Sequence, residues 1–335
     1  MHRLTSATWK RMLLGCLVMG LAASTLQAAP PPHQLIPDNT EMLFHFNIKN
    51  FMESSLVKGG LKDNVKSLMD ENKQLKGILD SIGFDPFRDL TSMTIALGNF
   101  KVDVSGGPPQ PNVEVLFILK GKFEKEKINT SLKTLISAGG QDKVGIGSMG
   151  DNTLYEFKEG NKPMFACILD NETMAASDRK EELQNVIDRL GGKKTTKLSK
   201  EFTTMLGRAD QKRTGYAVMM MPGSIKDMSA GMPNGEIVEK IEGMNIIIDV
   251  KENITIDFNT FTTDDAAAKQ FETMLNQAKD FLGIMALNAP DPEDSKDISD
   301  IISTMRVSAN KNMVSVKLEI KGTLIQRAIK KAKDR

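Results

Sequence analysis

Two stretches of the chain, 112-NVEVLFILK-120 and 253-NITIDFNTFT-262, decide the fold, because each opens the same order of elements. Both are rich in β-branched and aromatic residues, as strands are. Each leads into a segment with helical periodicity, 124–138 in the first case and 264–283 in the second. A hairpin and a second helix then follow. The sequence therefore predicts a strand-helix-hairpin-helix plan that is present twice.

The remaining elements of the two copies follow from alternation and from turn residues. In the first copy, strands are expected at 153–158, 163–169 and 173–176, and a helix at 178–190 that Ser177 would cap. In the second copy, strands are expected at 304–309 and 313–320, and a helix after Gly322. Short connections favour antiparallel pairing. The predicted class is α+β, an antiparallel sheet with helices packed on one face.

A further strand is predicted near the start of the mature chain, at 41–51. Its alternation places Met42, Phe44 and Phe46 toward a core and His45 on the other side.

The N-terminus has the layout of a secretory signal peptide. Basic residues precede the apolar run 12–23, and the small residue Ala28 stands just before a proline cluster. We therefore expect a cleaved signal at 1–28 and a periplasmic or secreted protein. The alternative is a lipoprotein anchored at Cys16, although the apolar stretch before Cys16 is short for that role.

After signal cleavage, the rest of the chain is expected to form two halves. A break near 191–197 is the boundary, so the first α+β half is 29–192 and the second is 193–335.

Composition excludes several classes of function. Loss of Arg3, Lys10 and Arg11 leaves 44 − 3 = 41 basic residues against 43 acidic ones, a net charge of −2. A nearly neutral chain has no general attraction for nucleic acid. Only Cys167 remains as a thiol, so no internal disulfide is expected. No later segment is apolar enough for a transmembrane helix.

No catalytic residue is assigned. The run 145-GIGSMG-150 has the letters of a dinucleotide motif, but a helix precedes it and a strand follows, so a glycine-rich turn is favoured. Cys167 lies in an apolar strand, where a thiol usually packs as a small hydrophobe. A pairing of Cys167 with His45 is the remaining nucleophilic arrangement. No cofactor is expected.

Methionine is the candidate metal ligand, because thioethers bind Cu(I). Met219, Met221, Met228 and Met232 fall in one short region and form the candidate site. The alternative is that these side chains fill the core. The acidic run after Pro290 lacks the glycine of an EF-hand and suits the start of a helix.

The C-terminal helix, 322–335, is amphipathic and basic. Peripheral contact with an anionic membrane is one interpretation, and docking of its apolar stripe on the sheet is the other.

Three short phrases resemble a loose family of uncharacterised exported proteins from planctomycete-type bacteria. They are 37-PDNTE-41, 55-SLVK-58 and 83-GFDPFRDL-90. The resemblance covers the layout of most of the mature chain and implies no known activity, so it assigns no functional residue.

The sequence thus predicts an exported, non-catalytic protein with a binding or structural role, whose partner is an unknown protein or cell-envelope component. The alternative function is a periplasmic carrier of an apolar ligand or Cu(I) through the methionine-rich region 219–232. The binding role requires an exposed apolar face, and the carrier requires a methionine-lined cavity.

Overall fold

The computed structural model describes residues 32–63, 76–77, 79–80, 83–103, 110–137, 144–158, 163–229, 235–288 and 291–333. These residues belong to one compact unit, Pro32–Arg335. The predicted signal peptide, Cys16 and the candidate ligand Met232 lie outside the described residues. Among the described helices, none combines the length and the apolar character that a membrane-crossing segment needs.

Within the described part of the chain, twelve strands form one sheet. They are β1 (Thr40–Phe46), β2 (Leu90–Asp103), β3 (Gln110–Gly121), β4 (Val144–Met149), β5 (Asn152–Phe157), β6 (Met164–Ile168), β7 (Thr173–Ser177), β8 (Gly215–Met220), β9 (Ile241–Val250), β10 (Ile254–Thr262), β11 (Arg306–Asn310) and β12 (Met313–Ile320).

Helices connect and flank these strands. They are η1 (Pro32–Gln34), α2 (Ile48–Glu53), the π-helical turn η2 (Val57–Leu61), α5 (Pro86–Asp89), α6 (Lys125–Leu135), α7 (Lys180–Leu190), α8 (Lys200–Gly207), α9 (Gly223–Ser229), α10 (Gly235–Glu239), α11 (Asp265–Leu287), α12 (Pro292–Thr304) and α13 (Gly322–Lys333).

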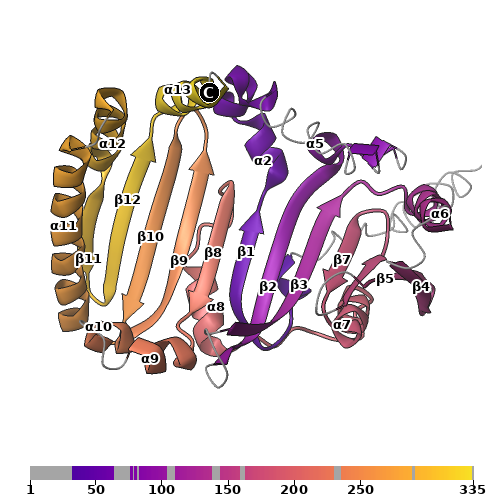
Figure 1. The fold of residues 1–335 in the computed structure, drawn as a ribbon. Coiled ribbons are helices and arrows are strands. Elements are labelled where there is room, and N and C mark those ends of the chain that lie inside the picture. The colour runs from indigo at the N-terminus through magenta and orange to yellow at the C-terminus, as the bar shows by residue number, and fades with distance from the viewer. Residues whose placement is uncertain are drawn as a thin grey trace, which may run out of the picture. The chain divides into compact units, whose positions relative to one another are not determined.

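The order of strands across the sheet confirms the repeated plan. It runs β11-β12-β10-β9-β8-β1-β2-β3-β7-β6-β5-β4, and every pairing is antiparallel. In each copy the opening strand, β3 or β10, pairs with the second strand of its hairpin, β7 or β12. The two copies thus form the two wings of one sheet, and β1 and β8 lie side by side at its centre (Figure 1). The predicted α+β class is confirmed.

The wings differ at their outer strands. The first copy adds the hairpin β4–β5 beyond β6, so the run Gly145–Gly150 is a strand and the turn after it, and the predicted glycine-rich turn is confined to its end. In the second copy, α11 packs against β11 and β12 at the other edge of the sheet (Figure 1). The amide of Ala309 in β11 donates to Glu272 Oε1 of α11 at 3.0 Å, which satisfies a backbone group of that edge strand.

Capping residues in the sequence indicate the first residue of one helix correctly and of another incorrectly. Asp264 caps α11, since its carboxylate accepts a hydrogen bond from the Ala267 amide at 2.7 Å. The predicted capping of α7 by Ser177 is wrong. Ser177 ends β7, its hydroxyl donates to the Val115 carbonyl, and α7 begins only at Lys180.

The main core lies on one face of the sheet, which we call the helix-covered face. Leu43 of β1 and Val218 of β8 are fully buried there beneath Leu183 and Val186 of α7 and Phe202 of α8. On the opposite side of the first wing, α6 packs over a smaller core. The predicted orientation of β1 is therefore wrong, because Leu43 and His45 point into the main core, whereas Phe44 points to the opposite face.

Candidate binding surface

The opposite face of the central strands carries a row of apolar side chains. Phe44 of β1 pairs directly with Ile95 of β2 on one side and with Ala217 of β8 on the other. Directly paired residues in a sheet point to the same face. The same register continues to Phe117 in β3 and to Ile246, Phe258 and Val316 in β9, β10 and β12.

Two neighbouring rows have the same character. One row contains Met42, Leu97, Val115, Met219, Met244 and Thr260, and the other contains Phe46, Met93, Leu119, Gly215, Ile248, Ile256 and Leu318. We call these three rows the apolar face. Thr260 is their one polar member, and none is charged.

Part of the apolar face is covered, since Leu119 packs against the smaller core under α6 and the Phe46 ring lies 5.4 Å from the Phe51 ring of α2. The rest of the face is partly open to water. Phe258 is 43% exposed and its neighbours in the row are partly exposed, whereas Leu43 and Val218 on the helix-covered face are 0% exposed. A contiguous apolar surface of this kind marks a site for an apolar ligand or partner. Sequence reasoning missed the site, because the rows exist only once the lateral order of the strands is known. The alternation of Met42, Phe44 and Phe46 was the one signal for it.

Three of the four candidate copper ligands lie in the described residues. Met219 lies in β8, Met221 follows that strand, and Met228 lies in α9. Met219 also has two methionines as direct neighbours, since it pairs with Met42 of β1 and with Met244 of β9. All three are partly exposed. The structure thus shows a methionine row that the chain spacing did not reveal.

The nucleophilic pairing of Cys167 with His45 does not form. The two residues lie in the same row of the sheet but are separated by four strand spacings, roughly 19 Å. Cys167 is 1% exposed, and burial raises the pKa of its thiol to about 11. At neutral pH the thiol is protonated and packs as a small hydrophobe.

A cleft of about 490 Å³ opens beside the start of β8 and the end of β9. Its polar lining is neutralised internally, since Arg213 donates to Asp210 at 2.8 Å and to Asp249 at 2.6 Å. Burial acts to raise the pKa of Asp249, but hydrogen bonds from Lys251 and Arg213 outweigh it and lower the pKa. An ionised, paired carboxylate lacks the raised pKa of a general acid.

The acidic run after Pro290 has a structural partner. Asp291 accepts from Lys331 of α13 at 2.7 Å, and Asp297 in α12 accepts from Arg327 at 2.6 Å. Leu324 of α13 is 5% exposed. Among the described residues, no group of three or more His, Cys, Asp or Glu side chains could hold a metal ion. The acidic residues and the basic C-terminal helix therefore bind one another.

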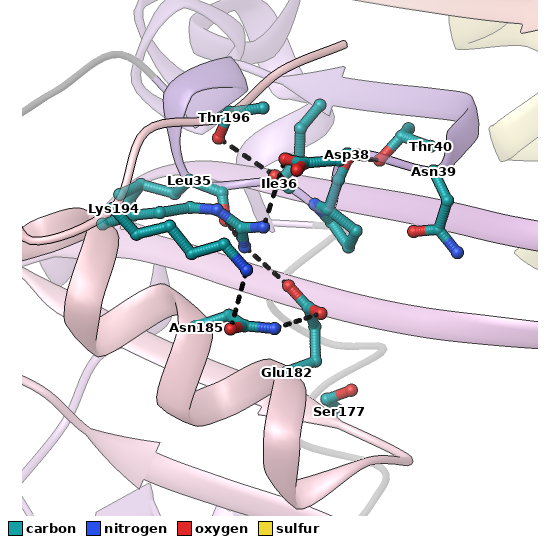
Figure 2. Close-up of polar contacts among 12 residues, drawn as sticks. Leu35, Ile36, Asp38, Asn39, Thr40, Ser177, Glu182, Asn185, Lys194 and Thr196 are labelled. Carbon is teal, nitrogen blue, oxygen red and sulfur yellow. Dashed lines mark hydrogen bonds and ion pairs between the residues drawn. The ribbon is translucent and has the colours of Figure 1, made fainter. Parts of the chain in front are cut away.

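A buried polar cluster joins the segment before β1 to α7 (Figure 2). Arg189 donates to Glu182 Oε1 at 2.6 Å and to the Leu35 carbonyl at 3.3 Å. The hydroxyl of Thr196 donates to the Ile36 carbonyl at 3.1 Å. Because Leu35 and Ile36 are themselves 0% exposed, this cluster anchors the N-terminal segment in the core. Its charges are paired with each other, so it is a structural element.

Comparison with known proteins gives the fold alone. No known protein family matches the chain, and no curated protein matches its sequence. Two solved structures are similar in fold. TP0453 in crystal form III has 9% identity and a TM-score of 0.51 over 89% of this chain and 97% of that chain. TP0453 in crystal form IV has 10% identity and a TM-score of 0.48, over 92% and 99%.

Proposed function

We propose that this chain is an exported, non-catalytic protein that binds an apolar ligand, such as a lipid acyl chain, on the apolar face. The observation that carries the proposal is the set of three apolar rows, which remain partly exposed although the sheet has a well-packed core on its other side. An apolar surface left in water is unfavourable by about 25 cal/mol for each Å², and a bound acyl chain removes that cost.

Two features of the apolar face suit a flexible chain rather than a polar small molecule. The rows contain no charge that would orient a polar group. Several of their side chains are methionines, which are unbranched and adapt their shape to what they contact. The signal peptide at 1–28 and the resemblance to exported planctomycete-type proteins agree with a cell-envelope location, and both belong to the proposal.

Binding of cis-parinaric acid, a fluorescent fatty acid, tests the proposal. The protein from Ala29 should bind the probe, and Ile95→Asp should abolish binding because it places a charge in the middle row. Thr255→Asp is the matched control, since Thr255 is an exposed residue of β10 that lies outside the three rows. Both variants should keep the native circular dichroism spectrum. Failure of the native protein to bind, or equal binding by Ile95→Asp, would refute the proposal.

A second candidate, Cu(I) binding, is favoured by the methionine row. Met42, Met219 and Met244 are neighbours on three adjacent strands, and thioethers select Cu(I). A Cu(I) titration of the native protein beside a Met42/Met219/Met244→Leu variant separates the two functions. Leucine keeps most of the volume, so the variant should still bind parinaric acid and should lose only the metal.

A further inference from the structure

The C-terminal end of α11 exposes more large apolar side chains than any other described helix. Five residues in its last two turns are 46–76% exposed, namely Phe281, Leu282, Ile284, Met285 and Leu287. The start of the same helix is different, because Ala267 and Ala268 are 0% exposed against the sheet. The helix therefore changes along its length from a core element to an apolar projection.

Polar contacts mark where this change occurs. Glu272 accepts the Ala309 amide, and Lys279 donates to the Met305 carbonyl at 2.8 Å. Beyond Lys279, Ala286 is the one buried residue of α11 among those described, at 3% exposure. The five apolar side chains follow the last of these contacts with the sheet edge. We call them the α11 tip.

The distribution of the tip around the helix axis indicates what covers it. At 100° for each residue, the five side chains spread over about 220° of the helix circumference. The remaining arc contains Gly283 and Ala286, the two small residues. A protein groove covers a narrower stripe of a helix, whereas an apolar medium covers every side at once.

The charges near the α11 tip indicate which kind of lipid surface it would contact. The adjacent residue Asp280 is acidic, and two of the basic residues of α13, Arg327 and Lys331, are paired with Asp297 and Asp291. An anionic surface would thus gain little attraction here. We propose that the α11 tip inserts into the interface of a zwitterionic lipid bilayer. This inference does not rest on the proposed ligand of the apolar face.

Flotation with phosphatidylcholine vesicles tests the inference. The protein from Ala29 should float with the vesicles, equally at low and high salt. A Phe281/Ile284/Leu287→Ser variant should lose more than tenfold of its partitioning. The matched control is Ile146→Ser with Phe157→Ser, which removes two side chains that are 44% and 39% exposed at the opposite edge of the sheet. The control should partition as the native protein does.

Three outcomes would overturn the inference. The first is that the native protein does not float with phosphatidylcholine. The second is binding that requires phosphatidylglycerol and disappears in an Arg327/Lys330→Gln variant but not in the tip variant, which would assign membrane contact to α13. The third is a dimer in sedimentation velocity that the tip variant dissociates while vesicle binding is absent, which would show that a second copy covers the tip. Loss of parinaric acid binding alone would leave this inference standing.

Discussion

The helices that close the two copies, α7 and α13, hold the same place in the repeat, but their arginines form ion pairs in opposite surroundings. In α7 the side chain of Arg189 is 2% exposed and pairs with Glu182, which is 12% exposed. In α13 the side chain of Arg327 is 55% exposed and pairs with Asp297 at the surface. Both pairs are 2.6 Å long. The two ion pairs have the same N–O distance, but their charges are exposed to water to very different degrees. That exposure determines how much each pair contributes to the free energy of unfolding.

The largest effect should follow from breaking the buried pair. Arg189→Ala leaves Glu182 buried without a cation and releases the Leu35 carbonyl, so we expect the free energy of unfolding to fall by about 3–5 kcal/mol. Urea denaturation measures it. Arg179→Ala is the control, because Arg179 is 41% exposed and pairs with Glu114, and it should cost less than about 1 kcal/mol. Equal losses of stability in the two variants would show that burial of an ion pair does not determine its contribution.

A double variant sharpens the same point. Arg189→Met with Glu182→Leu removes both charges and keeps apolar volume, so its stability should return close to that of the native protein. A loss as large as that of Arg189→Ala would mean that the contacts of Arg189 with Leu35 and Asp38 matter more than its ion pair with Glu182.

Acid should destabilise the native protein through another buried polar group, His45. Burial lowers the pKa of His45 from 6.5 to about 4, and the nearby charge of His33 adds to the shift. Between these values the unfolded chain binds a proton that the native protein does not. Stability should therefore fall as pH falls from 6.5 to 4, by up to about 3 kcal/mol. Thermal denaturation of His45→Gln should show a flatter pH dependence than the native protein. His33→Gln should also flatten it, but by less, because burial lowers the pKa of His33 and the charge of His33 is the smaller of the two causes at His45.

The smallest effect should follow at α13. Arg327→Ala should lower the free energy of unfolding by less than about 1 kcal/mol, because both partners are partly solvated. In 1 M NaCl, where the Debye length is about 3 Å, this difference should disappear, while that of Arg189→Ala should persist. Hydrogen exchange of α13 amides in both salts measures it. A salt-independent loss of several kcal/mol would contradict the comparison.

Local pattern was enough to predict the repeat but not the length of α11. The spacing of apolar residues predicts a helix over 264–283 with Gly283 at its end, yet the helix continues to Leu287. Glycine inside a helix costs only about 1 kcal/mol relative to alanine, so a helix can continue through Gly283. The part of the tip after Gly283 was therefore missed.

The apolar face could not be predicted, for a different reason. In β1 both sides of the strand are apolar, with Leu43 toward one face and Phe44 toward the other. Periodicity shows that two sides exist, but it does not show on which side the helices lie. The covered side is determined by α7 and α8, which pack on it and follow more than 100 residues later in the chain (180 − 46 = 134). The methionine row depends on register in the same way.

The central position of β1 has a kinetic consequence. Met42 of β1 pairs with Met219 of β8, which follows 219 − 42 = 177 residues later. Closing so long a loop is entropically costly, and folds rich in such contacts form slowly. The first strand to be synthesised is thus among the last to gain both of its neighbours. Under the export that we propose, this delay would keep the emerging polypeptide unfolded until most of it is available.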